Sequence, residues 1–170
     1  PSLLASDKNL EYSVELYSLT KGYSMAGWRV GFAVGNSDAV GALTKLKSYI
    51  DYGTFQPIQI ASTVALNELD DYPFELSTVY KERRDLVQEY LEDLEFIVQE
   101  SDATMFVWAK LPKRFNKDSL KFSLDILEKS NVAISPGIGF GKFGEGHIRI
   151  ALVENKQRIR QAMKNIKAAL

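Results

Sequence analysis

The chain has 170 residues, of which 45% are hydrophobic and 25% are charged, and its formal net charge is −1. Such a composition predicts a globular protein of one domain, or a piece of one domain with a smaller second unit. The near-zero net charge gives no indication of a nucleic-acid partner. The sequence has no cysteine and one histidine, His147, which excludes disulfides, a cysteine nucleophile and a cysteine or histidine metal cluster.

No apolar run approaches the about 20 residues needed to cross a bilayer. The N-terminus also lacks the charged region and apolar core of a signal peptide. We therefore expect a cytoplasmic protein without a membrane partner. The chain begins with Pro1 instead of methionine, so we also expect that it was processed or belongs to something longer.

The first part of the chain predicts two strands followed by two helices. Tyr12–Tyr17 is rich in β-formers, and the nearly continuous apolar run Trp28–Val34 predicts a second, central strand. The small residues of SLTKGYSMAG between them predict a loop or tight turn. The expected helices are Ala39–Ser48, with Ser37 or Asp38 as its N-cap, and Ile58–Leu69.

The second part begins with a long amphipathic helix, Phe74–Leu94, in which apolar residues recur every three or four positions. In HIRIAL, Ile148 and Ile150 should share one strand face while Arg149 lies on the other. The glycine-rich SPGIGFGKFGEG, which precedes HIRIAL, predicts a loop. The remaining expected elements are strands Phe96–Gln99, Met105–Ala109, Val132–Ile134 and His147–Leu152, and helices Asp118–Ser130 and Asn155–Leu170.

These elements predict an α/β fold in two units. We place them at residues 1–73 and 74–170, joined by the long helix of residues 74–94. Two strands in the first unit would leave unpaired edges. We therefore expect further sheet residues upstream of Pro1 in a longer parent protein.

The strongest chemical pattern surrounds Lys21, which lies three residues after Ser18 and eight before Arg29. Lysine forms Schiff bases with carbonyl compounds, and burial lowers its pKa so that it can act as a nucleophile and base. A hydroxyl and a guanidinium can together hold a phosphate. The pattern predicts a site for a phosphorylated aldehyde cofactor. The alternative is a surface lysine in a turn beside a structural arginine.

The stretch Ser18–Gly31 resembles the cofactor-attachment signature of the class I aminotransferases, which use pyridoxal 5′-phosphate (PLP), at every defined position. Further segments resemble the alanine (glutamate–pyruvate) and LL-diaminopimelate aminotransferase branch in order and spacing, so the resemblance covers essentially the whole chain. It implies the C-terminal part of a fold-type I PLP-dependent transferase, with the end of the large mixed-sheet domain and the small α+β domain. These segments are VGNSDAVGALTKLKSYIDYGTFQPIQIA, MFVWAKLP, SPGIGFGKFGEGHIRIALVEN and RIRQAMKNIK.

The resemblance assigns roles residue by residue. Lys21 matches the lysine that holds PLP as a Schiff base and then moves the substrate proton as general base and general acid. Ser18 and Arg29 match residues that bind the PLP phosphate. Arg149 matches the arginine that grips the substrate α-carboxylate. The implied reaction transfers an amino group between an L-amino acid and a 2-oxo acid, of alanine/glutamate or aspartate type, in a homodimeric parent.

For several other residues the expected role is less specific. Phe106 either lines the substrate side or belongs to the core, and Tyr52 and Thr54 approach the partner subunit's cofactor in the family. Pro136–Gly141 is implied to lie near the substrate entrance. His147 is expected on the strand surface without a role.

The resemblance also implies groups that are absent here. In the family an aspartate holds the pyridine nitrogen, a tyrosine and an asparagine hold the ring oxygen, and a glycine-rich helix N-terminus binds part of the phosphate. All of these come from upstream of the lysine. Without them the electron sink is weak, so we expect a part of an aminotransferase that is inactive alone.

Two alternatives stay open. Ser18-x-x-Lys21 also fits the acyl-serine motif of penicillin-binding proteins and β-lactamases. That motif should open a helix, and Gly22 and Gly27 argue against one here. The C-terminal unit could instead be a non-catalytic interaction domain, which should not expose a large apolar patch.

Overall fold

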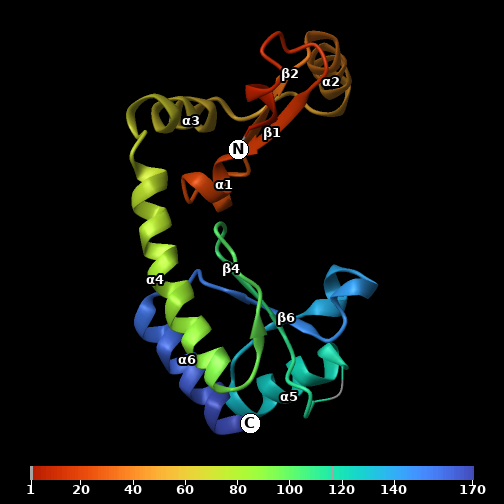
Figure 1. Cartoon of the computed structure of the whole chain (residues 1–170). Helices are drawn as coiled ribbons and strands as arrows, with labels where there is room; N and C mark the ends of the chain where they lie inside the picture. The colour runs from red at the N-terminus through yellow and green to blue at the C-terminus, as the bar shows by residue number, and fades with distance from the viewer. Residues whose placement is uncertain (1, 116) are drawn as a thin grey trace. The chain divides into compact units, whose positions relative to one another are not determined.

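The computed structural model describes residues 2–115 and 117–170, which form two compact units dividing between Leu76 and Ser77 (Figure 1). The division falls inside helix α4 (Tyr72–Asp93). The other elements of the first unit are η1 (Leu3–Ala5), β1 (Val14–Ser18), α1 (Leu19–Gly22), η2 (Ala26–Trp28), β2 (Gly31–Gly35), α2 (Ser37–Ile50) and α3 (Gln56–Glu68).

Strands β1 and β2 form an antiparallel hairpin in which Ser18 pairs with Gly31. Within the described residues β2 pairs with β1 alone, so its expected central position stays a prediction for a longer chain. A Cβ at Gly31 would lie 2.5 Å from the Tyr17 carbonyl oxygen, and this close approach of the two backbones requires glycine. The connection SLTKGYSMAG folds into α1 and η2 instead of a simple loop.

The N-cap of α2 is Asn36, and not Ser37 or Asp38 as predicted. The Asn36 Oδ1 accepts from the Ala39 backbone N–H at 2.9 Å, while its Nδ2 donates to the Glu11 carbonyl oxygen at 2.8 Å. One amide side chain therefore both caps the helix and ties it to the segment that precedes β1. Pro57 lies in the first turn of α3, where a missing N–H costs nothing, so it begins the helix instead of preceding it.

The second unit is a four-stranded antiparallel sheet covered on one face by helices. Its strand order is β3-β4-β6-β5. Figure 1 shows α4 and α6 next to each other alongside the sheet, and α5 below the strands in that view. The elements after α4 are β3 (Ile97–Val98), β4 (Phe106–Lys110), α5 (Ser119–Ser130), β5 (Ser135–Pro136), η3 (Gly137–Phe140), η4 (Lys142–Gly144), β6 (His147–Ala151) and α6 (Lys156–Ala169).

The strand predicted at Val132–Ile134 is wrong. Helix α5 ends at Ser130, its C-cap Asn131 has a left-handed φ of 55°, and the chain pairs with β6 only from Ser135 onward. The glycine-rich segment that follows forms η3 and η4, so it has more local structure than the predicted loop.

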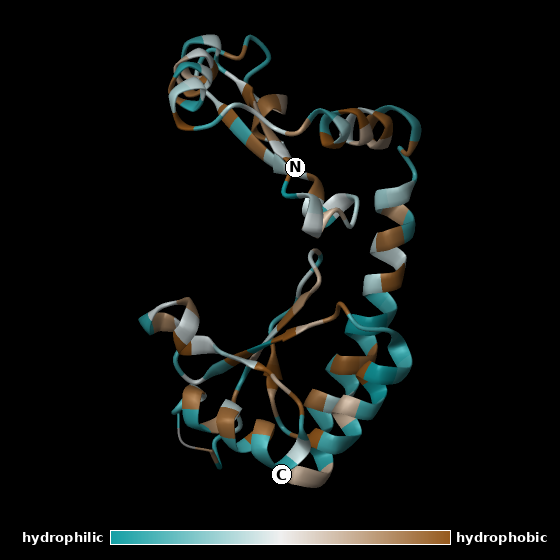
Figure 2. Ribbon diagram, turned by 180° about the vertical axis from the view of Figure 1, so that it is seen from behind, coloured by the Kyte–Doolittle hydropathy of each residue, from teal (hydrophilic) through white to brown (hydrophobic). Residues whose placement is uncertain are grey.

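The buried hydrophobic cluster lies entirely within the second unit. In Figure 2 hydrophobic residues recur along both the helices and the strands of this unit. The cluster joins α4, α5 and α6 to the inward faces of β4 and β6, which predicts that this unit carries most of the folding free energy of the chain. Its members are Leu86, Val87, Leu91, Leu94, Phe96, Val107, Ala109, Leu111, Phe122, Ile126, Ile148, Leu152, Ile159, Met163 and Ile166.

Among residues 2–76, by contrast, the buried hydrophobic side chains are Leu19 and Ala65. Large apolar side chains of this unit such as Leu16 and Ile50 are exposed. None of the helices in the described part of the chain is long and apolar enough to span a membrane.

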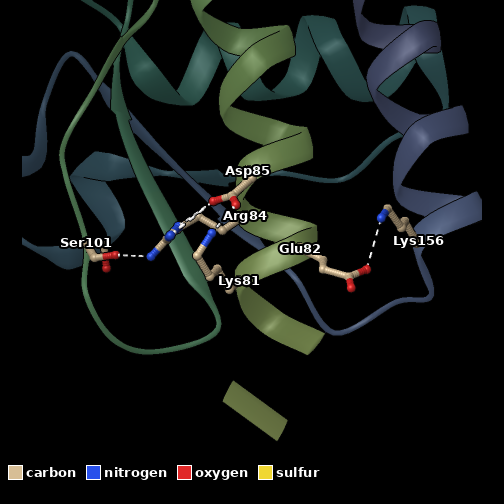
Figure 3. A network of polar contacts seen from close by, with 6 residues as sticks. All are labelled: Lys81, Glu82, Arg84, Asp85, Ser101 and Lys156. Carbon is tan, nitrogen blue, oxygen red and sulfur yellow. Dashed lines mark hydrogen bonds and ion pairs between the residues drawn. The ribbon is translucent and has the colours of Figure 1, made fainter. Parts of the chain in front are cut away.

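Polar contacts fasten α4 to its surroundings in the second unit (Figure 3). Arg84 donates to the Ser101 carbonyl oxygen at 2.6 Å and pairs with Asp85 at 3.0 Å. Lys156 at the start of α6 pairs with Glu82 at 3.0 Å. The contacts connect one helix to the loop before β4 and to α6, and so complement the apolar packing beneath them.

Candidate active site

The hairpin connection between β1 and β2 carries the three residues predicted to hold the cofactor. Ser18 ends β1 and is the N-cap of α1, where its Oγ accepts from the Thr20 backbone N–H at 3.3 Å. Lys21 lies in the single turn of α1, and Arg29 follows η2. Because Ser18 pairs with Gly31, Arg29 lies at the same end of the hairpin as Ser18. All three side chains are exposed.

Helix α1 corrects one sequence argument. We expected no helix to open at Ser18, yet Ser18 caps one, because its hydroxyl satisfies an N–H of the first turn. The helix is a single turn, and the Leu19 side chain anchors it by complete burial. The Leu19 N–H also donates to the Val30 carbonyl oxygen at 3.3 Å, which fixes the turn beside the residue that follows Arg29.

Arg29 has an uncommon backbone conformation, with φ 52° and ψ 50°. The left-handed region is sparsely used by residues other than glycine, and such outliers cluster at functional sites. Its Nη1 donates to the Ala26 carbonyl oxygen at 3.3 Å. Among residues 2–115 and 117–170 no carboxylate lies within 4.0 Å of its side-chain nitrogens, so donors remain for an anion.

These features fit a phosphate group. The Ser18 Oγ accepts a hydrogen bond in its capping role and keeps its own hydrogen to donate. The Arg29 guanidinium supplies charge and further N–H donors at the same hairpin end. A hydroxyl, a guanidinium and a primary amine on one short connection are the donor set that a phosphorylated aldehyde needs.

Arg149 lies on β6 in the second unit, between β4 and β5, so it is not on an edge strand. Its guanidinium carbon is 4.2 Å from the ring centroids of both Phe106 and Phe140. Its Nε is buried and has no hydrogen-bond partner among the residues that the structure describes. No carboxylate in the described part of the chain pairs with it. A cation whose described neighbours are two aromatic rings keeps its terminal N–H donors for a ligand.

Strand alternation separates this site from the core. Ile148 on β6 and Val107 on β4 are buried under the helices, while Arg149 and its pairing neighbour Trp108 lie on the other face of the sheet. Trp108 stacks on His147 with ring centroids 5.4 Å apart. Strand periodicity could have placed Trp108 on this face, since it alternates with the apolar Val107.

The remaining expectations have mixed outcomes. Phe106 is half-buried and contacts Arg149, so it is not plain core. His147 is half-buried against Trp108, with its Nδ1 3.2 Å from the Glu145 carbonyl oxygen, so it is not simply a surface residue. Tyr52 and Thr54 lie between α2 and α3, and their expected role toward a partner subunit stays a prediction.

Phe140 was not predicted as a site residue. It comes from η3, in a segment anchored to the start of α5 by the buried Ser119. The Ile138 N–H donates to the Ser119 Oγ at 3.1 Å, and the Ser119 N–H donates to the Glu145 carboxylate at 2.6 Å. The Gly146 N–H donates to the same Glu145 oxygen at 3.0 Å. These bonds fix both ends of the glycine-rich segment relative to α5.

The Glu145 anchor should make the stability of the second unit depend on pH. The Ser119 backbone N–H, the Ser119 hydroxyl and the Gly146 N–H hold the pKa of Glu145 below its ordinary value of 4.5. Because the folded-state pKa is lowered, ionised Glu145 contributes its full stabilisation to the folded state above pH 4.5. This contribution is lost as the pH falls through the folded-state pKa. We expect Glu145→Gln to lower the melting temperature at pH 7 and to flatten its decline in acid.

Thermal melts followed by circular dichroism from pH 7 to below pH 4.5 would measure this difference. Glu128→Gln, at an exposed position on α5, is the control and should track the unsubstituted protein at every pH. Equal acid sensitivity of Glu145→Gln and the unsubstituted protein would contradict the anchoring role.

Comparison with known proteins identifies relatives along the whole chain. The family described as Aminotransferase class I and II matches residues 2–166. The glutamate-pyruvate aminotransferase AlaC of Escherichia coli (strain K12) is 44% identical over 99% of this chain and 41% of its own length. An LL-diaminopimelate aminotransferase of Natranaerobius thermophilus is 47% identical over 97% of this chain and 42% of its own length.

A solved structure of an aminotransferase from Staphylococcus aureus matches with a TM-score of 0.90 at 35% identity, covering 99% of this chain and 45% of that chain. The α/β fold expected from the sequence is thereby confirmed as part of the aminotransferase fold. The chain spans 41–42% of the length of the two curated relatives above. Since the family match extends over residues 2–166, this chain belongs to the class I and II aminotransferases.

Proposed function

We propose that the protein to which this chain belongs is a PLP-dependent aminotransferase, with Lys21 as the lysine that bonds to the cofactor. The observation that carries the proposal is the β1–β2 connection, which holds Ser18, Lys21 and Arg29 at one end of a single hairpin. The family membership supports it. The helical turn at Ser18 removes one argument against the acyl-serine alternative, but that turn ends at Gly22, and the family match over residues 2–166 favours the aminotransferase.

In this proposal Ser18 and Arg29 bind the phosphate. The hydroxyl donates one hydrogen bond, and the guanidinium adds charge-assisted bonds that are stronger than neutral ones. When bound, PLP supplies an electron sink for the bond that breaks at the substrate Cα. The Lys21 amine holds and returns the Cα proton, acting first as general base and then as general acid.

Arg149 binds the substrate α-carboxylate in the same proposal. Its guanidinium offers a planar pair of donors that matches a carboxylate in a bidentate arrangement, and fixing the carboxylate orients the Cα substituents. The named relatives support an alanine/glutamate–pyruvate type of substrate pair, with LL-diaminopimelate and aspartate types as the other candidates. A homodimeric assembly and a cytoplasmic location complete the proposal, on the family resemblance alone.

Reductive trapping tests the assignment of Lys21. The purified protein is incubated with PLP, reduced with borohydride and mapped by peptide mass spectrometry. We expect the phosphopyridoxyl group on Lys21 in preference to exposed lysines such as Lys45 on α2. A label spread evenly over the lysines, or a labelled penicillin bound to Ser18, would overturn the proposal.

A further inference from the structure

The surroundings of Arg149 are unusual for a half-buried cation. A buried or half-buried guanidinium ordinarily pairs with a carboxylate, because desolvation of an unpaired charge is costly. Here the neighbours are two phenyl rings, each with its centroid 4.2 Å from the guanidinium carbon. Phe106 comes from the adjacent strand β4, and Phe140 comes from η3, shortly before β6 in the chain. We call these two rings with Arg149 the aromatic clamp.

Rings and carboxylates hold a cation with different consequences. A carboxylate neighbour neutralises the charge and occupies N–H donors, so it competes with an incoming anionic ligand. An aromatic ring attracts the cation through its π face and leaves the N–H groups at the edge of the guanidinium unused. The aromatic clamp can therefore order the guanidinium without reducing its capacity to bind a carboxylate.

Phe140 also contacts a second aromatic side chain, Trp108. Their rings form a T-shaped pair with centroids 5.7 Å apart and an interplanar angle of 77°, and Trp108 stacks on His147. Trp108 is also the pairing neighbour of Arg149 across β4 and β6. The Phe140 ring is thus packed against Trp108 on β4, the strand that pairs with β6 at Arg149.

Burial does not explain an aromatic side chain at this position. Phe140 is 50% exposed, so a large part of its ring gains nothing from removal from water. Phe143 in the same segment offers a comparison, since it is 89% exposed and its ring contacts the Lys142 ammonium at 5.0 Å. Phe140 differs by touching Arg149 and Trp108, which points to a role through the arginine.

We propose that Phe140 is a positioning residue for carboxylate recognition, one that fixes the Arg149 guanidinium so that its terminal N–H groups face the incoming carboxylate. This inference rests on the proposed function of Arg149 as the carboxylate-binding residue. Phe140 contacts the arginine and takes no part in proton transfer. Its loss therefore weakens carboxylate binding without affecting the binding of a neutral ligand of the same shape.

Ligand titration of the protein without PLP tests the inference independently of catalysis. Two-dimensional ¹H–¹⁵N NMR would follow the Trp108 indole and the β6 amides as propionate, or its neutral analogue propionamide, is added at constant ionic strength. We expect Phe140→Leu to weaken propionate binding by about 3- to 30-fold, the range that a partly desolvated cation–π contact supports. Phe140→Met, which keeps the bulk without the π face, should behave alike.

Three further variants separate the possible results. Phe140→Tyr keeps the ring and should bind propionate as the unsubstituted protein does, as should the matched control Phe143→Leu. Arg149→Met should lose the preference for propionate over propionamide. The dispersion of the amide spectrum reports whether each variant is folded.

Propionate binding that is unchanged in Phe140→Leu and Phe140→Met but lost in Arg149→Met would overturn the inference and leave the proposed role of Arg149 intact. Equal weakening of propionate and propionamide would also overturn it, because the ring would then supply only apolar contact. Full propionate preference in Arg149→Met would instead overturn the proposed function of Arg149.

Discussion

Lys21→Arg is expected to abolish covalent attachment of PLP, so that borohydride leaves no phosphopyridoxyl group at position 21. A guanidinium stays protonated at all accessible pH values and does not form a Schiff base with the cofactor aldehyde. It cannot accept the Cα proton either. In any preparation that transaminates, the substitution should therefore lower the rate by at least about 100-fold, the lower bound for loss of a positioned general base.

The experiment is clean because arginine keeps the charge and most of the length of the lysine side chain. Lys21 is exposed in a one-turn helix, so the substitution should leave the thermal unfolding curve unchanged. Lys45→Arg is the matched control, an exposed lysine on α2 whose replacement should leave labelling intact. Retention of the full cofactor label in Lys21→Arg would show that another amine carries PLP.

Leu91→Ala is expected to cost about 2–5 kcal/mol of the free energy of unfolding of the second unit. Leu91 on α4 has no exposed surface and belongs to the cluster that joins α4 and α6 to the sheet. Removing its side chain leaves a cavity that the surrounding helices can fill only in part. Urea titration followed by circular dichroism would measure the loss as a lower midpoint at unchanged slope.

Leu124→Ala provides the comparison for that value. Leu124 lies on α5 and is 56% exposed, so we expect its truncation to cost less than about 1 kcal/mol. A similar loss of unfolding free energy for the two leucines would contradict the placement of the buried cluster between the sheet and its helices.

Much of the hairpin site can be read from the sequence, because its residues are close together along the chain. Ser18, Lys21 and Arg29 lie on one connection, and the apolar runs on either side predict the two strands that bring its ends together. The helical turn at Ser18 was missed because a single turn gives no periodic pattern, and its stability comes from a cap and from the buried Leu19. The cap at Asn36 was missed for a related reason, since its second bond goes to the distant Glu11.

The surroundings of Arg149 were predictable only in part. Strand alternation correctly places Arg149 opposite Ile148, since the period of two is a local property. Phe140 could not be found in this way. It reaches Arg149 through a loop whose path depends on Ser119, on Glu145 and on the spacing of its glycines, and such a contact leaves no period in the sequence. The strand predicted at Val132–Ile134 failed because pairing with β6 begins further along, at Ser135.

The alternation of β6 links recognition to correct folding. The same five residues send Ile148 into the core and Arg149 to the opposite face, so a slip of one residue would bury the charge and expose the isoleucine. Under the proposed role of Arg149, misregistered chains would not bind a carboxylate at this strand. A carboxylate bound by Arg149 would then add its binding free energy to the stability of chains folded in register alone.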